Sequence, residues 1–279
     1  MDEVLQIGQV ASLLDISQDT LRYFDKEKIV SPKKAKNGYR YYDDWDINFL
    51  IEYKRYRSFE LNMEESRQVL YEDSLDDLVA RMAENTQRIE REIRRTQMLL
   101  EYNQCYTRAL QEIPKKISRW QITNMVGIDY FPMRYNNTYL SKPEINELFG
   151  AWVTRFPFVA PILIVDETSG SDYQCGLSMP HAYKGEFHLP VNHLVQTIAK
   201  TAAVNTVIVA GDRNTFSTRL LEPTYRYIAE QGLRIVGPAI GYYLARVHEK
   251  KGYTRYIDVY IPVDGPVPQS EETAAQMAR

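Results

Sequence analysis

The stretch TLRYFDKEKIVSPKKAKNGYRYY, Thr20 to Tyr42, decides how the first part of the chain folds. Between Arg22 and Arg40 it carries seven basic residues and only Asp25 and Glu27 as acids, whereas the whole chain of 279 residues has a net charge of -3. Lysines scattered over a surface more often form a solvated face than a binding site. The pattern around the stretch is what distinguishes these two interpretations.

Two short helices are predicted at the start of this stretch. The first has apolar residues at the spacing of one helix face: Ile7, Val10, Ala11 and Leu14. A turn over residues 15–17 follows, and Ser17 is a suitable N-cap for a second helix that turns Leu21 and Phe24 inward. This pattern is typical of a helix-turn-helix.

A basic hairpin is predicted after the second helix. Asn37-Gly38 separates a lysine-rich arm from the strand-like Tyr39–Tyr42, and Asn-Gly favours a two-residue turn. A recognition helix enters a major groove about 12 Å wide while flanking basic groups neutralise phosphates, so local charge matters more than the total. Arg40 and Tyr41 would hold the DNA backbone, and Arg22 can reach base edges or phosphate. The candidate DNA-binding residues are Ser17, Gln18, Thr20, Arg22, Tyr23, Lys36, Tyr39, Arg40 and Tyr41.

Residues 5 to about 70 resemble the winged-helix head of the MerR family of transcription regulators. The family's LRYYD element is present as Leu21-Arg22-Tyr23-Phe24-Asp25, with phenylalanine in place of the commoner tyrosine, and its YRYY wing is present as residues 39–42. The resemblance implies DNA contacts from Arg22, Tyr23, Arg40 and Tyr41. It also implies two further helices, roughly over residues 43–61 and 63–71.

A long helix is predicted from Leu75 to Ile113, a segment without proline or glycine. Two heptad series run along it: Leu75, Met82, Ile89, Thr96, Asn103 and Leu110, and four residues further on Val79, Thr86, Ile93, Leu100 and Thr107. The polar members either fix the register of a coiled coil or mark where the seam meets other domains. The heptads indicate a partner helix, and the MerR resemblance implies an antiparallel homodimer.

After Pro114 the pattern strand, helix, strand, strand occurs twice, which predicts an α+β domain with helices on one side and a concave sheet surface. The first unit covers 119–131, 142–156, 161–166 and 173–179, and the second covers 206–210, 222–231, 239–247 and 255–263. The ending GPAIGYYLARVHEKKGYTRYIDVYIPV resembles that of GyrI-like effector-binding domains.

The second domain is rich in aromatic residues, which suit a flat apolar or cationic ligand because aromatic faces attract organic cations. Most aromatic residues belong to cores, so each one is individually more often structural. The candidate ligand-binding residues are Tyr130, Phe131, Trp152, Phe156, Tyr173, Tyr225, Tyr242, Tyr256 and Asp258. Asp258 occupies the acidic position of the family's closing strand, where it either attracts a cation or serves as a hydrogen-bonded structural aspartate. Cation-binding members have a glutamate on the preceding strand, where this chain has Gly241, so the site could also rely on rings alone.

Two rival functions follow from the same residues. A metal-sensing regulator is disfavoured because the four histidines and two cysteines show no ligand spacing. An enzyme is disfavoured because no set of nucleophile, base and orienting residue stands out, although Tyr242 or Tyr256 could act with Asp258, as paired Tyr and carboxylate do in some relatives of the domain. No metal or other cofactor is expected.

The expected organisation is a MerR-type winged-helix domain (1–73), a dimerisation helix (74–113), a GyrI-like domain (114–265) and a disordered tail (266–279). With no apolar run of about 18 residues, no signal peptide and two distant cysteines, Cys105 and Cys175, we expect a cytoplasmic protein without membrane contact. The family resemblance implies a homodimer that senses a small lipophilic, cationic, multidrug-type compound. It also implies activation, in which the dimer distorts an overlong promoter spacer for RNA polymerase.

Overall fold

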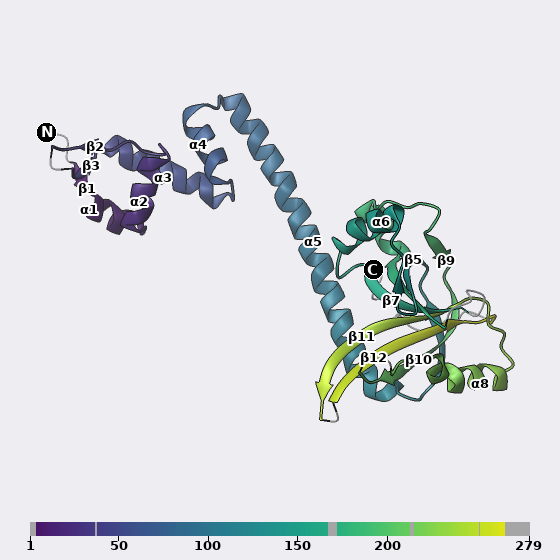
Figure 1. The fold of residues 1–279 in the computed structure, drawn as a ribbon. Coiled ribbons are helices and arrows are strands. Elements are labelled where there is room, and N and C mark those ends of the chain that lie inside the picture. The colour runs from purple at the N-terminus through teal and green to yellow at the C-terminus, as the bar shows by residue number, and fades with distance from the viewer. Residues whose placement is uncertain (1–3, 37, 167–171, 213–214, 251, 266–279) are drawn as a thin grey trace. The chain divides into compact units, whose positions relative to one another are not determined.

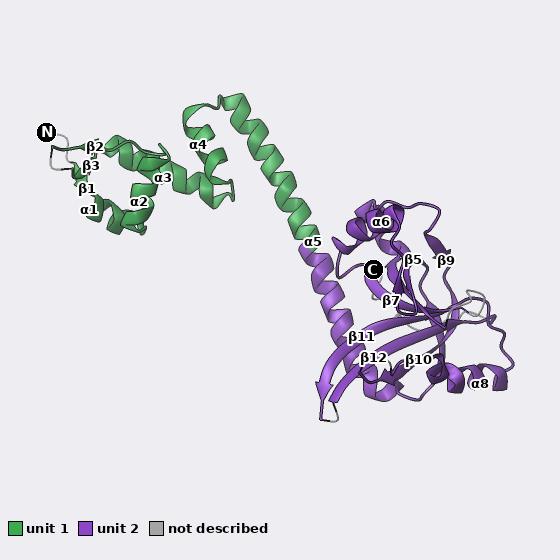
Figure 2. Cartoon of the chain, in the orientation of Figure 1, with its two compact units in different colours: residues 1–95 green, residues 96–279 purple. Residues whose placement is uncertain are grey.

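A computed structural model describes residues 4–36, 38–166, 172–212, 215–250 and 252–265. The chain divides into two compact units, residues 1–95 (unit 1) and 96–279 (unit 2), and the boundary falls inside the long helix α5 (Figures 1 and 2). The predicted tail and Asn37 of the predicted hairpin turn lie outside the described residues.

Unit 1 contains the predicted helix-turn-helix. Leu21 and Phe24 are buried, as expected, in a core with Val10, Tyr42 and Tyr53. The Ser17 hydroxyl accepts a hydrogen bond from the backbone N–H of Thr20 and so caps the second helix. The elements are β1 (Leu5–Gln6), α1 (Ile7–Leu14), α2 (Gln18–Lys26), β2 (Lys33–Lys34), β3 (Arg40–Tyr42), α3 (Asp44–Ser58) and α4 (Met63–Tyr71).

The wing is a hairpin of β2 and β3, and β3 also pairs with β1. The pairing extends beyond β2, because Ala35 N–H donates to the carbonyl of Tyr39 at 3.0 Å. Gly38 has φ +81°, a conformation that glycine adopts without a Cβ penalty. The predicted wing is therefore present.

Helices α3 and α4 match the pair that the resemblance implied, but α3 ends at Ser58, before the expected residue 61. Glu60 has φ +65°, which a right-handed helix cannot accommodate. Capping boxes at Asp43 and Asn62 open the two helices by binding their first free N–H groups.

The long helix α5 spans Leu75–Lys116. The expected end at Ile113 is corrected, because Ile117 N–H still donates to the carbonyl of Ile113 at 3.2 Å. Pro114 has no backbone N–H, so the helix lacks one hydrogen bond at this position. The residues after it keep their N–H donors, and the last turn of the helix therefore forms.

Unit 2 contains one antiparallel sheet of nine strands among the described residues, in the order β4-β10-β12-β11-β7-β8-β5-β6, with β9 beside β5. The two predicted repeats are β5-α6-β7-β8 and β10-α8-β11-β12, and they meet where β7 and β11 pair antiparallel. The strands are β4 (Gln121–Met125), β5 (Ile128–Tyr135), β6 (Thr138–Tyr139), β7 (Ala160–Val165), β8 (Gln174–Pro180), β9 (Gln196–Ile198), β10 (Thr201–Ala210), β11 (Ala239–Glu249) and β12 (Gly252–Pro262). The helices are α6 (Pro143–Val153), η2 (His181–Tyr183), α7 (Lys184–Phe187), η3 (Thr218–Leu221) and α8 (Glu222–Glu230).

The single strand expected over residues 119–131 is two strands. β4 pairs with β10, whereas β5 pairs with β8, so the two strands belong to opposite halves of the sheet. The break falls at Val126-Gly127, where a Cβ on Gly127 would lie 2.5 Å from Nδ1 of His181. Glycine therefore allows the close approach that separates the strands.

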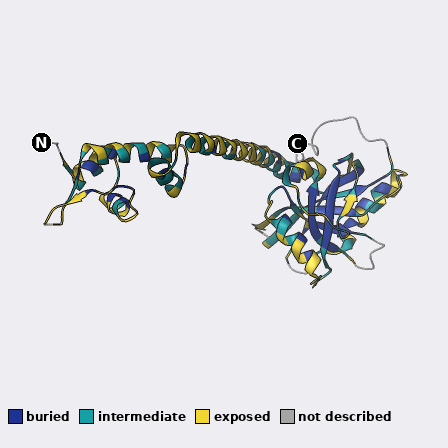
Figure 3. Cartoon of the chain, turned by 90° about the horizontal axis from the view of Figure 1, so that it is seen from above, coloured by how far each residue is buried: buried dark blue, intermediate teal, exposed yellow. Residues whose placement is uncertain are grey.

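The two faces of this sheet have different partners. Helix α6 packs through Trp152 on Phe131 and Leu177, and α8 packs through Ile228 in the core that contains Val259. On the opposite face, Ile113 at the end of α5 packs against Val207 and Leu244. Figure 3 shows the strands of this sheet as the most buried part of unit 2. Among the described residues, no helix combines the length and apolar character that crossing a bilayer requires.

Candidate DNA-binding surface and ligand cavity

Helix α2 presents polar residues outward. Leu21 and Phe24 face the core, while Gln18, Arg22 and Tyr23 are exposed. The Arg22 guanidinium donates to Asp19, one turn before it on the same helix, so it is held at the surface without being buried. An exposed, preoriented arginine on a recognition helix suits contact with a phosphate or a guanine edge.

The wing is tied to α2 by one carboxylate. Asp25 Oδ2 accepts from Arg40 Nε at 2.7 Å and lies 2.8 Å from Lys34 Nζ. Burial favours the neutral form of Asp25, but the hydrogen bonds and positive charges of Lys34 and Arg40 outweigh it, so the pKa of Asp25 lies below its ordinary value. Asp25 therefore stays ionised and fixes the wing against the helix.

The structure places the nine candidate DNA-binding residues on two adjoining elements. Ser17, Gln18, Thr20, Arg22 and Tyr23 lie at or after the start of α2, and Lys36, Tyr39, Arg40 and Tyr41 lie on the wing. Sequence reasoning missed Asp25 and Lys34 as the link between these elements. The sequence signal that could have identified this link is the opposite charge of Asp25 on the helix and Lys34 on the wing.

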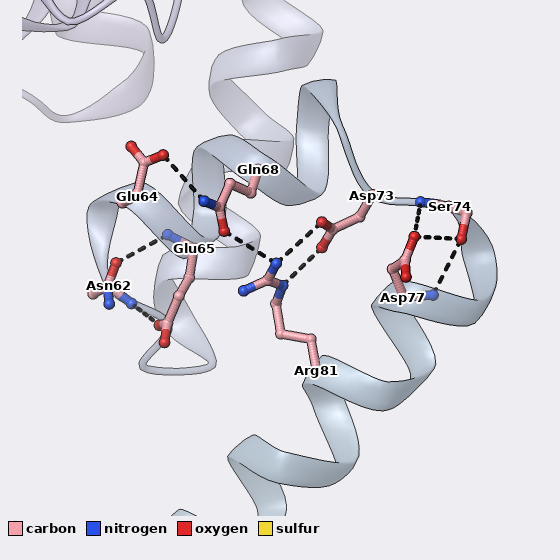
Figure 4. Close-up of polar contacts among 8 residues, drawn as sticks. All are labelled: Asn62, Glu64, Glu65, Gln68, Asp73, Ser74, Asp77 and Arg81. Atoms are coloured by element: carbon pink, nitrogen blue, oxygen red, sulfur yellow. Dashed lines mark hydrogen bonds and ion pairs between the residues drawn. The ribbon is translucent and has the colours of Figure 1, made fainter.

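A polar joint connects α4 to α5 (Figure 4). Arg81 on α5 donates to both carboxylate oxygens of Asp73, at 2.7 and 3.0 Å, and to Oε1 of Gln68 at 3.1 Å. Ser74 and Asp77 cap the start of α5 reciprocally. The bidentate geometry fixes the direction in which α5 leaves the helix-turn-helix domain.

Unit 2 contains a cavity of about 910 Å³ between the last part of α5 and the sheet face opposite α6 and α8. The helix supplies residues such as Tyr102, Tyr106 and Lys116, and the sheet supplies residues such as Tyr242, Asp258 and Tyr260. The remaining wall comes from β4 and from residues 156–161. A volume of this size matches the clefts that take small organic ligands.

One end of the cavity is polar. Asp258 Oδ1 accepts from Asn205 Nδ2 at 2.7 Å, Oδ2 accepts from the Tyr260 hydroxyl at 3.0 Å, and Lys116 Nζ lies 3.9 Å from Oδ1. Burial raises the pKa of Asp258 above its ordinary value, although Lys116, Asn205 and Tyr260 each act in the opposite direction. The carboxylate is thus hydrogen-bonded within the protein itself.

The cavity includes three of the nine candidate ligand-binding residues: Phe156, Tyr242 and Asp258. Phe156 is 46 % exposed, and the Tyr242 ring meets the Tyr260 ring edge-on at 6.0 Å between centroids. The two tyrosines and Asp258 come from β11 and β12, whose paired positions Tyr242 and Asp258 share the cavity face.

The other six candidates do not line this cavity, and we remove them from the proposed site. Phe131 and Trp152 pack on each other, with ring centroids 5.1 Å apart, under α6 on the opposite sheet face. Both were selected for residue type. Strand alternation turns Phe131 away from the cavity, and Trp152 lies on α6, which covers that opposite face. Tyr130, Tyr173, Tyr225 and Tyr256 have partners elsewhere: Gln196, Phe216, the α8-side core and Glu249, respectively.

Sequence reasoning missed Tyr102, Tyr106, Lys116, Asn205 and Tyr260, which all line the cavity. Tyr102, Tyr106 and Lys116 lie on α5, and the first two fall in the region 74–113 that was assigned to dimerisation. The i, i+4 spacing of Tyr102 and Tyr106 was a signal of a shared helix face.

Position 241 does not face the cavity. A Cβ at this position would lie 2.8 Å from Cγ2 of Ile257 and 3.4 Å from Cβ of Leu163, both in the core on the α8 side. A side chain at position 241 would therefore point away from Tyr242 and Asp258. Within the described ranges, no three His, Cys, Asp or Glu side chains are placed to hold a metal ion.

Unit 1 thus has the architecture of a winged helix-turn-helix DNA-binding domain. Residues 5–73 match the model of the MerR HTH family regulatory proteins. Residues 5–73 therefore carry a MerR-type helix-turn-helix domain.

Two curated relatives are transcription regulators by name. The transcriptional regulator BrlR of Pseudomonas aeruginosa is 29 % identical over 146 residues, which cover 46 % of this chain and 51 % of BrlR. The HTH-type transcriptional regulator HmrR of Rhizobium leguminosarum bv. viciae is 32 % identical over 71 residues, which cover 25 % of this chain and 55 % of HmrR. The chain spans about half the length of each.

Among solved structures, a looser likeness extends over more of the chain. The cryo-EM structure of the EcmrR–DNA complex in EcmrR-RPo is 13 % identical, with a TM-score of 0.38, and the match covers 93 % of this chain and 99 % of that one.

Proposed function

We propose that this protein is a ligand-responsive transcription regulator. It binds promoter DNA as a homodimer through α2 and the wing, and it takes a lipophilic aromatic compound into the cavity of unit 2. The observation that carries the proposal is the presence, in one chain, of a MerR helix-turn-helix domain and a cavity of about 910 Å³ lined by aromatic side chains.

The dimer is supported by the surface of α5. Leu75, Val79, Ile93 and Leu100, all members of the two heptad series, are 75, 62, 52 and 57 % exposed. Exposed apolar residues at heptad spacing favour a second helix that covers them. Two DNA-binding domains that are joined by a pair of α5 helices suit a palindromic operator.

The regulatory step follows from the family resemblance. The dimer would sit on an overlong promoter spacer and distort it, so that RNA polymerase can engage both promoter elements, at an energetic cost that depends on the spacer sequence. Since α5 is continuous from the Arg81 joint to the cavity wall, a ligand needs only to favour one of two dimer geometries. A coupling of about 1–3 kcal/mol would change output roughly five- to 150-fold.

The raised pKa of Tyr260, which lines the cavity, favours ligand sensing over hydrolysis. The Tyr260 hydroxyl donates to Asp258, and burial together with the Asp258 charge raises the pKa of Tyr260 well above its ordinary value. A phenol in that state is a poor nucleophile and a poor proton donor at neutral pH.

The test has two parts. Operator sequences are selected from a random DNA pool by the purified full-length protein, and transcription by RNA polymerase from the selected operator is then measured. Separately, an aromatic dye is incubated with the protein and followed by absorbance and chromatography. The proposal expects a palindromic operator and a saturable, reversible spectral shift. Recovery of no enriched sequence, or chemical conversion of the dye, would contradict it.

A further inference from the structure

The charges that line the cavity do not favour a cation. Its walls contain two basic side chains, Arg108 and Lys116, and two acidic ones, Glu112 and Asp258. Glu112 is already paired with Lys115 at 2.6 Å between Oε1 and Nζ. Among the charged groups of the cavity wall, Asp258 is therefore the remaining acid that could attract a lipophilic cation.

Asp258 is poorly placed to receive a cation. Both of its oxygens accept hydrogen bonds, from Asn205 and from Tyr260, and only 6 % of its side chain is exposed. An organic cation that approached Oδ1 would also meet the ammonium group of Lys116, which lies 3.9 Å from that oxygen. Like charges at such distances in a partly dry site repel each other.

Lys116 is the polar group with unused capacity. Its side chain is 19 % exposed, and its ammonium carries three N–H donors. At 3.9 Å the contact with Asp258 is too long for a hydrogen bond, and the described residues supply no other hydrogen bond to Nζ. A largely buried ammonium at a cavity wall is stabilised by an acceptor, and a ligand can supply one.

We propose that Lys116 and Asp258 make the cavity select aromatic compounds bearing an oxygen acceptor, such as a carboxylate, phenolate or carbonyl, over lipophilic cations. The rings of Tyr102, Tyr242 and Tyr260 hold the aromatic part, and Lys116 Nζ donates to the acceptor. Asp258 acts as the fixed counter-charge of Lys116. This inference rests on the proposed function, because it names the ligand class of the same cavity.

The experiment uses the full-length protein and displacement of the neutral dye Nile red. Three competitors share one ring system and differ in the head group: naphthoate, acetylnaphthalene and naphthylmethyl-trimethylammonium. We expect naphthoate and acetylnaphthalene to displace the dye at concentrations about tenfold lower than those the cation requires. A difference of about tenfold in affinity is what one charge-assisted hydrogen bond contributes. Lys116→Met should remove this advantage. Lys250→Met, at an exposed position that does not line the cavity, should keep it.

Asp258→Asn provides an independent readout, because it changes the charge without changing the shape of the side chain. The inference expects naphthoate to bind this variant at least as tightly as it binds the wild type. Tightest binding of the cation to the wild type, lost in Asp258→Asn, would overturn the inference and leave the ligand-sensing function standing. Failure of Nile red and all three competitors to bind would overturn the ligand-sensing function as well.

Discussion

Arg40 on the wing and Asp25 at the end of the recognition helix are joined by a hydrogen bond of 2.7 Å from Nε to Oδ2. This contact joins the wing directly to α2. A DNA-binding surface made of two elements needs such a fixed relation, because base and phosphate contacts must be made at the same time.

Removing the Asp25 charge should destabilise unit 1. Asp25→Asn leaves Arg40 and Lys34 without their shared counter-charge, and we expect the free energy of unfolding to fall by about 1–2 kcal/mol. Urea denaturation followed by circular dichroism measures this. Glu27→Gln, an exposed acid just beyond α2, is the matched control and should be neutral. Equal stabilities of all three proteins would refute the assigned role of Asp25.

The same pair predicts a pH dependence. Because the pKa of Asp25 is lowered from 3.8 in the folded state, its contribution to stability is present above pH 3.8 and disappears as the pH falls through the lower, folded-state pKa. The stability difference between wild type and Asp25→Asn should therefore shrink in this acidic range. Denaturation curves at a series of pH values test the point, and a difference independent of pH would argue against it.

Arg22 should be essential for operator binding. We expect Arg22→Ala to lose operator affinity at physiological salt, while dye binding in unit 2 is unchanged. If Arg22 contacts a phosphate, the slope of log affinity against log salt falls by about 1, whereas a base contact relaxes sequence preference instead. Gel shifts at several salt concentrations distinguish the two. Wild-type operator affinity in the variant would show that Arg22 is not part of the DNA-binding surface.

The exposed heptad residues of α5 should hold the dimer. Ile93→Glu places a charge at a seam position that is 52 % exposed in the single chain, and we expect the variant to be monomeric in analytical ultracentrifugation. Gln97→Glu adds the same charge at an exposed position outside the two heptad series and should stay dimeric. A dimeric Ile93→Glu protein would place the interface elsewhere.

Trp152 should matter for folding and not for ligand contact. It is buried, and its Nε1 donates to the carbonyl of Pro190 at 3.0 Å. Trp152→Ala should cost about 3–5 kcal/mol of stability. Tyr242→Ala should instead weaken binding of an aromatic dye with a smaller loss of stability, because the Tyr242 ring lines the cavity. Thermal unfolding and dye titration on both variants would show the reverse pattern if the site lay under α6.

The local pattern was enough to predict the helix-turn-helix, the long helix and the repeated β-α-β-β order. Leu21, Phe24 and the capping Ser17 each act within a few residues, so their roles are visible in sequence. The cavity was harder to predict, because it joins Tyr106 and Lys116 on α5 to Asp258 across more than a hundred residues. Residue type identified Tyr242 and Phe131 equally, and only the strand register shows that they lie on opposite faces.

In the proposed function, occupation of the cavity changes promoter output. The most direct measurement is transcription by RNA polymerase from a selected operator, titrated with an aromatic ligand, for the wild type and for Tyr242→Ala. We expect the ligand to change transcript yield for the wild type, and the variant to need more ligand for the same change. Transcript yield that does not respond to a ligand shown to bind the wild-type cavity would contradict it.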